Sequence, residues 1–149
     1  MAEPVTPVNG ELDWLITRFA DENPQIEEAA VVSSDGLLLA HSSRGEGAQG
    51  DRLAAIACGI AALAVSCSDI AEGGRVRRAL VDLEHGCLLL CHLSEGALLA
   101  VHASDGCDLS LLTYQSTRLA RRAGVALTPA PRGGPYERSA RRFGPGAGP

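Results

Sequence analysis

The sequence contains no lysine, and all 13 of its basic residues are arginine. Together with the abundant alanine, glycine and proline, this is typical of a GC-rich bacterial genome and carries no functional information. Aromatic residues make up only 3% of the chain, although 46% of it is hydrophobic. The core must therefore be built from Leu, Val, Ile and Ala, which favours flat layers of helix and sheet over a deep aromatic pocket.

Positive charge is also scarce in the part of the chain that can fold. The formal net charge is −5, yet Arg132, Arg138, Arg141 and Arg142 all lie in the Pro/Gly-rich end of the sequence. The remainder is clearly acidic, and an acidic surface repels phosphate backbones. We therefore expect no nucleic-acid partner.

Long apolar runs and an export signal are missing as well. Met1 to Gly10 has neither a positive start nor an apolar run, and Leu53–Val65 and Cys87–Leu93 fall short of a membrane span or are interrupted by polar residues. These features predict a cytoplasmic location without membrane insertion. The five cysteines lack short paired spacings, which indicates reduced thiols.

The length of 149 residues suits one domain. A first helix is expected between Asn9-Gly10 and Asn23-Pro24, and Asp35-Gly36 predicts a tight hairpin between two strands. Asp51 is the expected N-cap of a long helix, and Gly124 is expected to end the last one. The remaining expected elements are strands at 26–33 and 37–42, the long helix at 51–72, strands at 75–84, 87–93 and 97–103, and a last helix at 108–123.

The order helix, two strands, helix, three strands, helix predicts an α/β (α+β) fold with a five-stranded antiparallel sheet. One long helix is expected on one face of the sheet and two helices on the other. The domain is expected to span residues 11–128, after a flexible stretch at 1–10. From Pro129 to Pro149 the mixture of Pro, Gly and Arg cannot build a core, which predicts a disordered tail.

The long helix carries two apolar rows. Large residues recur at spacings of three and four, which we interpret as the face that packs on the sheet: Leu53, Ile56, Ile60, Leu63, Cys67 and Ile70. Small residues form a second row: Ala55, Gly59, Ala62 and Ser66. Small side chains let a second helix approach closely, and Gly59 costs ~1 kcal/mol against Ala, so the second row is a candidate interface. The alternative is alanine-rich filler that reflects composition.

The strand expected at 75–84 alternates charged and apolar residues. Were it an edge strand that pairs antiparallel with its own copy about Leu80, Arg78 would face Asp82 of the mate. The alternative is that the charges protect an exposed sheet edge from unwanted pairing.

Candidate chemistry is weak throughout. Cys87 and Cys91 share a strand face but lie ~13 Å apart, and Cys58 and Cys67 are separated by a similar rise along their helix, so neither pair holds a metal locally. We interpret these four cysteines as buried, reduced thiols. His41, His85, His92 and His102 lie on strands or turns without a nucleophile signature. The Gly-rich loop at 43–47 lacks the Lys-Ser/Thr ending of a phosphate-binding loop. We expect no catalytic residue, metal or cofactor.

Five motifs in one order produce a specific resemblance: Asp13-Trp14-Leu15, Ser33-Ser34-Asp35-Gly36-Leu37, Leu53-Ala54-Ala55-Ile56-Ala57, Leu98-Leu99-Ala100-Val101 and Gly124-Val125-Ala126-Leu127-Thr128-Pro129. From about Glu11 to Pro129 the chain resembles bacterial roadblock/dynein-light-chain-family proteins. It is most similar to actinobacterial members encoded with a sensor kinase-like protein and a small Ras-like GTPase. The resemblance implies a profilin-like sandwich, a homodimer and regulation of such a GTPase.

The resulting hypothesis is a non-enzymatic homodimeric regulator of a small Ras-like GTPase in bacterial signalling. Its interface is expected at Ala55, Gly59, Ala62, Ser66, Arg78, Leu80 and Asp82. Arg44, Arg52 and Arg75 are candidate contacts with the GTPase. The alternative is a scaffold that links a histidine-kinase-like receptor to other proteins without affecting GTP hydrolysis. A small-molecule sensor is a third class, disfavoured by the scarcity of aromatics.

Overall fold

The computed structural model describes residues 7–42, 47–93 and 96–127. The tail expected at 129–149 lies outside these residues. The elements follow the expected order: α1 (Pro7–Glu22), β1 (Ile26–Val32), β2 (Leu38–His41), α2 (Gly47–Ala71), β3 (Arg78–Asp82), β4 (Cys87–His92), β5 (Leu98–Ala103) and α3 (Leu109–Leu127). The expected fold class is confirmed.

All five strands form one antiparallel sheet in the order β2-β1-β5-β4-β3. The central strand β5 pairs with β1 through Ala30↔Ala100 and with β4 through Leu90↔Ala100. β1, β4 and β5 are buried along almost their whole length, because both faces of the sheet are covered there. β2 and β3 are the two edges.

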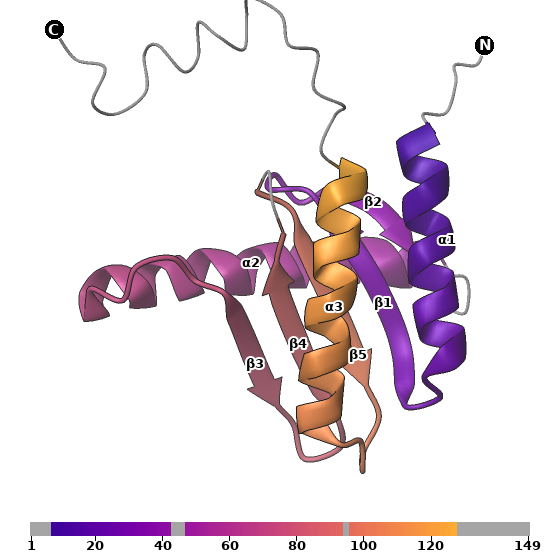
Figure 1. The fold of residues 1–149 in the computed structure, drawn as a ribbon. Coiled ribbons are helices and arrows are strands. Elements are labelled where there is room, and N and C mark those ends of the chain that lie inside the picture. The colour runs from indigo at the N-terminus through magenta and orange to yellow at the C-terminus, as the bar shows by residue number, and fades with distance from the viewer. Residues whose placement is uncertain (1–6, 43–46, 94–95, 128–149) are drawn as a thin grey trace, which may run out of the picture.

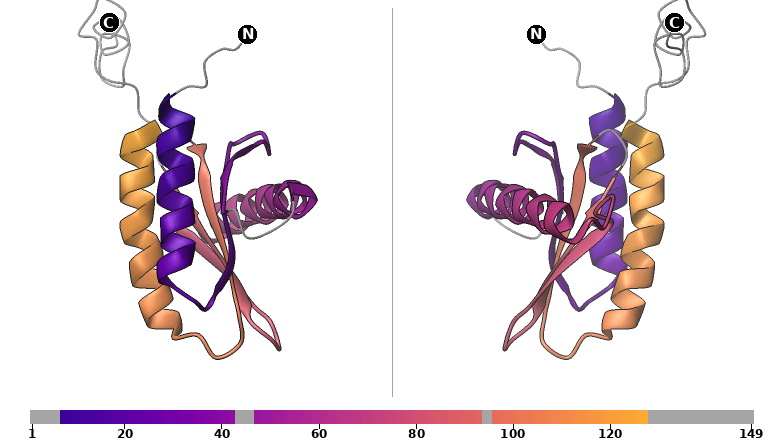
Figure 2. Two further views of the ribbon diagram at one scale, coloured as in Figure 1. Left: turned by 90° about the vertical axis from the view of Figure 1, so that its right-hand side faces the viewer. Right: turned by 90° about the vertical axis from the view of Figure 1, so that its left-hand side faces the viewer.

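Helices cover the two faces unequally. α1 and α3 lie side by side on one face, and α2 crosses the other face alone (Figure 1; Figure 2). The α1/α3 side holds the larger apolar cluster, which includes Leu12, Ile16, Leu99 and Leu119. The α2 side holds a smaller cluster that includes Leu53, Ala57, Leu90 and Leu98.

α2 begins at Gly47, so Asp51 lies inside the helix and the prediction that it caps the N-terminus is wrong. Gly50 lies where α2 passes β2. A Cβ at Gly50 would come within 2.9 Å of the Leu38 side chain and 3.2 Å of the His41 ring. The helix ends where Glu72 adopts a left-handed conformation (φ 52°) and the Gly73 amide donates to the Ser68 carbonyl.

α3 begins where expected but runs past its expected end. The Asp108 carboxylate accepts a hydrogen bond of 3.1 Å from the Leu111 amide, as an N-cap does. Gly124 does not end the helix, which continues to Leu127. Because Ala123 and Ala126 are buried on either side of Gly124, packing offsets the ~1 kcal/mol that glycine costs inside a helix.

Gly50 and Gly59 sit in the same helix in opposite surroundings, since a Cβ at Gly59 meets nothing within 4 Å. We predict that Gly59→Ala raises the free energy of unfolding by ~0.5–1 kcal/mol, because alanine loses less backbone entropy on folding. In Gly50→Ala the methyl group crowds Leu38 and His41, so that gain disappears or reverses. Urea denaturation of both variants tests this, and equal gains would contradict the close approach of α2 to β2.

Candidate interaction surface

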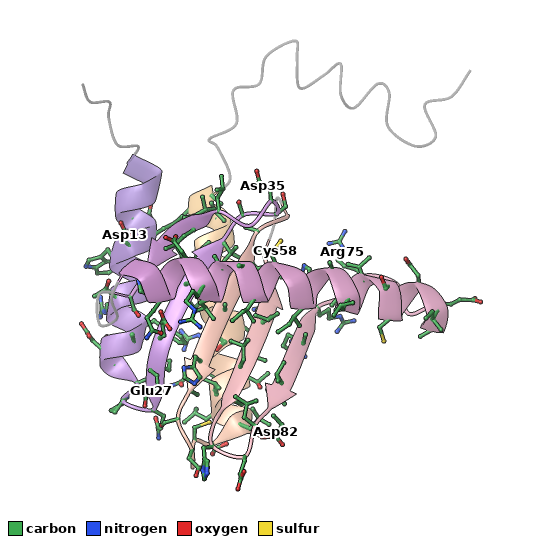
Figure 3. The ribbon with its side chains drawn as sticks, turned by 180° about the vertical axis from the view of Figure 1, so that it is seen from behind. Asp13, Glu27, Asp35, Cys58, Arg75 and Asp82 are labelled. Carbon is green, nitrogen blue, oxygen red and sulfur yellow. The ribbon has the colours of Figure 1, made fainter. Side chains whose placement is uncertain are left out.

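α2 is longer than the sheet is wide. Its 25 residues span about 37 Å, whereas five strands span about 24 Å. The helix crosses the strands and continues past the β3 edge (Figure 3). Leu53, Ala54 and Ala57 are buried on the sheet, and Ile60 and Ala61 are partly buried. We call residues 62–71, which follow them, the overhang.

The large residues of α2 do not all face the sheet. Leu53 is buried as expected, but Ile56, Leu63 and Ile70 are 51%, 71% and 87% exposed. Cys67 of the same row is exposed as well, so assigning these four residues to the sheet-packing face was wrong. The residues of α2 that pack on the sheet are mostly alanine. Because Ile56, Leu63 and Ile70 are spaced by seven, they form a row along one side of the helix, next to the sheet-facing residues. We call Ile56, Leu63 and Ile70 the flank row.

The apolar segment of α2 is also longer than the sequence suggested. Gln49–Ala71, 23 residues, is long and apolar enough to cross a membrane by length and composition, and 17% of it is buried. The expectation that no stretch reaches that length was wrong, because the helix adds residues at both ends of Leu53–Val65. A mostly buried core helix of a soluble protein can have the same length and apolar composition. The segment shows how much apolar surface α2 leaves uncovered.

A groove of about 390 Å³ runs along α2 on the flank-row side. Its apolar walls include Ile56 and Ile60 from the helix and Val81 and Leu88 from the sheet. At its other end lie Glu28, Arg52 and His102. Glu28 is largely buried, and its Oε2 lies 2.5 Å from Nε2 of His41, which ties β1 to β2 beneath the start of α2.

The small row lies on the outer side of the helix. Ala55 and Gly59 are each two residues from buried Ala57, which places them about 160° away from it, and Ala62 and Ser66 continue the row. All four residues are exposed. We call them the outer row. Their role as an interface stays a prediction.

β3 is the edge strand that the charge pattern anticipated. Ala79 and Val81 turn towards α2, whereas Arg78, Leu80 and Asp82 are exposed on the opposite face. Asp82 lies at the far end of the strand from α2 (Figure 3). Pairing of this edge with a second copy remains a prediction.

Of the three candidate arginines, the structure describes Arg52 and Arg75, which lie in different segments of the chain. Arg44 lies outside the described residues. Arg52 is exposed in the N-terminal part of α2, and Arg75 is exposed in the segment that returns from the end of α2 towards β3. Within one chain Arg52 and Arg75 form no common site.

The cysteines differ in burial more than the sequence suggested. Cys87 and Cys91 are buried, and desolvation raises the pKa of each thiol to about 11. Cys67 is exposed, so it was wrong to include it among buried thiols. Sequence spacing missed Cys107, which lines the same cavity as Cys87. Over the described ranges, no three His, Cys, Asp or Glu side chains are arranged to hold a metal.

A known protein family and several solved structures are similar to this chain. The sequence pattern of the Roadblock/LC7 domain matches residues 12–103. A Roadblock/LC7 domain from Streptomyces avermitilis superposes with a TM-score of 0.72 at 28% identity, over 77% of this chain and 96% of that one. No curated protein sequence matches the chain.

Two more distant structures share the fold. The gliding protein MglB from Thermus thermophilus has a TM-score of 0.73 at 17% identity, over 84% of this chain and 97% of that one. MglB from Myxococcus xanthus has a TM-score of 0.70 at 11% identity, over 77% and 93%. At these identities the likeness concerns the fold alone. The domain match over 12–103 shows that this chain belongs to the Roadblock/LC7 family.

Proposed function

We propose that this chain is a homodimeric regulator of a small Ras-like GTPase and carries out no chemistry of its own. The observation that carries the proposal is the uncovered apolar flank of α2, which continues beyond the sheet edge. An apolar surface of this extent is typical of a protein interface. The partners come from the resemblance to roadblock-type regulators encoded beside such GTPases.

The first partner is a second copy of the chain, joined at β3. Pairing two β3 strands antiparallel extends the sheet across both copies and removes an exposed edge. In a register centred on Leu80, Arg78 of each copy faces Asp82 of the other, and each such pair contributes ~0.2–1 kcal/mol. A two-fold axis normal to the sheet relates the copies.

The same axis pairs the two α2 helices. Each overhang passes beyond its own β3 and lies over the sheet of the second copy, beside that copy's α2 and antiparallel to it. With Leu63 at the axis, Ile56 of one copy meets Ile70 of the other. Alternating spacings of three and four suit this helix-to-helix packing.

The groove beside α2 supports this arrangement. It opens on the flank-row side, where Val81 is only partly buried on the sheet face. The overhang of the second copy fills it with apolar side chains, so both exposed surfaces are buried together. This accounts for a long apolar helix of which 17% is buried within one chain.

The outer row then remains exposed and binds the GTPase. In the proposed dimer Ala55, Gly59, Ala62 and Ser66 of both helices face away from the sheet. Small side chains permit close approach of a partner's backbone. Binding here favours one nucleotide state or positions the GTPase's own catalytic groups.

A scaffold is the second candidate function. The same dimer would tether a histidine-kinase-like receptor to other proteins and leave GTP hydrolysis unchanged. The exposed flank row supports the scaffold as well as the regulator, because the row is evidence for a dimer and says nothing about GTP hydrolysis.

We predict that the wild type sediments as a dimer at micromolar concentration. Leu63→Asp raises the dimer Kd by about 100-fold or more, because it buries two unpaired carboxylates near the axis. Gly59→Arg, on the outer row of the same helix, leaves the dimer intact. Sedimentation velocity distinguishes the two variants.

A wild-type monomer under these conditions excludes the dimer. Dissociation by Gly59→Arg with an intact Leu63→Asp dimer would show instead that the outer row is the helix seam.

The regulatory claim predicts that single-turnover GTP hydrolysis by the neighbouring Ras-like GTPase changes by about tenfold or more in the presence of the dimer. Gly59→Arg abolishes this effect while the protein remains dimeric. Arg52→Ala and Arg75→Ala weaken it less than tenfold, whereas loss of an inserted catalytic arginine costs about 10³-fold.

The scaffold gives a different result in the same experiment. Binding of the GTPase with no change in hydrolysis rate or nucleotide affinity would rule out regulation and leave the scaffold.

A further inference from the structure

Two loops touch at the end of the sheet that carries Asp82. One joins β3 to β4 and contains His85 and Gly86, and the other joins β5 to α3. His85 Nδ1 lies 3.4 Å from the Asp105 carboxylate across the two loops. Gly86 has a φ of 98°, and a Cβ there would clash with the Ala103 carbonyl oxygen. The two loops are therefore held in close contact.

This contact brings two thiols together. Cys87 is the first residue of β4, where it pairs with Ala103 and is buried. Cys107 lies in the β5–α3 loop and is half-buried. Both residues line one cavity, and Cys107 is close enough to affect the pKa of the Cys87 thiol.

A cavity of about 180 Å³ gives access to the pair. Cys87, Gly86 and Cys107 line it together with Asp105 and Leu109. Water occupies about 30 Å³ in the liquid, so the cavity admits a molecule the size of hydrogen peroxide. A small oxidant therefore reaches the sulfur atoms without unfolding of the sheet.

The two thiols are not equivalent. Burial, the adjacent Cys107 and then the Asp82 carboxylate raise the pKa of Cys87 to about 11, so Cys87 stays protonated near neutral pH. Cys107 is the more exposed of the two. This makes Cys107 the thiol that meets an oxidant first and Cys87 the thiol that resolves the product.

We propose that Cys87 and Cys107 form a reversible disulfide in response to hydroperoxides. The Cys107 thiolate attacks one oxygen of the peroxide, the O–O bond breaks, and hydroxide leaves, which gives a sulfenic acid. The Cys87 sulfur then attacks the Cys107 sulfur. The S–S bond forms, the S–OH bond breaks, and the Cys87 proton leaves with the hydroxyl group as water.

The bond returns to two thiols by exchange with a dithiol, which takes the oxidising equivalents and becomes a disulfide itself. Disulfides in reducing compartments are usually transient, and some of them act as sensors of oxidants. The proposed disulfide would tie the start of β4 to the segment before α3, next to the last residue of β3. This inference does not depend on a GTPase partner.

The test uses the full chain, reduced and then exposed to hydrogen peroxide. After the remaining thiols are alkylated, peptide mass spectrometry is expected to find Cys87 joined to Cys107. Dithiothreitol reverses the link. The Tm of the oxidised protein rises by roughly 5 °C or more, because the bond restricts the unfolded chain.

Matched variants separate this pair from the other thiols. Cys107→Ser loses both the cross-link and the rise in Tm, while its reduced form melts close to the wild type. Cys58→Ser and Cys67→Ser, both on α2, retain the link and the rise. A Cys107 that is oxidised to sulfenic or sulfinic acid without joining Cys87, or that links to another molecule, overturns the proposal.

Discussion

The mismatch between a helix of about 37 Å and a sheet of about 24 Å governs the rest of this structure. Because α2 crosses the strands, its excess length projects past β3 instead of lying along the sheet. The overhang is mostly apolar, so its exposure to water is unfavourable in free energy. The smaller apolar cluster beneath α2 is incomplete for the same reason: its groove needs side chains that the single chain does not supply.

The two faces of the sheet therefore have different physical roles. α1 and α3 close the larger cluster within one chain, with Leu12, Ile16 and Leu99 almost fully buried. The α2 face relies on alanines, which bury little area and let the helix lie close to the strands. One face supplies most of the stability of the single chain, and the other leaves apolar side chains of α2 exposed.

Much of this was predictable from sequence because local signals agree. The Asp35-Gly36 hairpin, the three-strand meander and the alternation in β3 all follow from side-chain period and turn residues. The sequence did not predict which surface the large apolar residues of α2 contact. Periodicity shows that Leu53 and Leu63 share a stripe, but not whether a sheet or a second helix covers it. The sheet-facing alanines carry no signal in an alanine-rich chain.

Long-range and context effects explain the other errors. Gly124 resembles a helix end, but burial of Ala123 and Ala126 against the core overrides its low helix propensity. Asp51 resembles an N-cap, yet helical residues precede it. Cys87 and Cys107 are far apart in sequence and meet only because two loops converge at one end of the sheet. No spacing rule finds such a pair.

Three sides of α2 point in different directions: around the helix axis Ile56 lies about 100° from Ala57, and Gly59 lies about 60° beyond Ile56. Ala57 faces the sheet, Ile56 faces sideways into the groove, and Gly59 faces outward. Filling the sideways surface with a second copy leaves the outward surface accessible. Large side chains suit the permanent contact, which needs buried area, and small ones suit a partner that must bind and leave. In the proposed dimer, the copies thus associate through one side of α2 and the GTPase binds the adjacent side of the same helix.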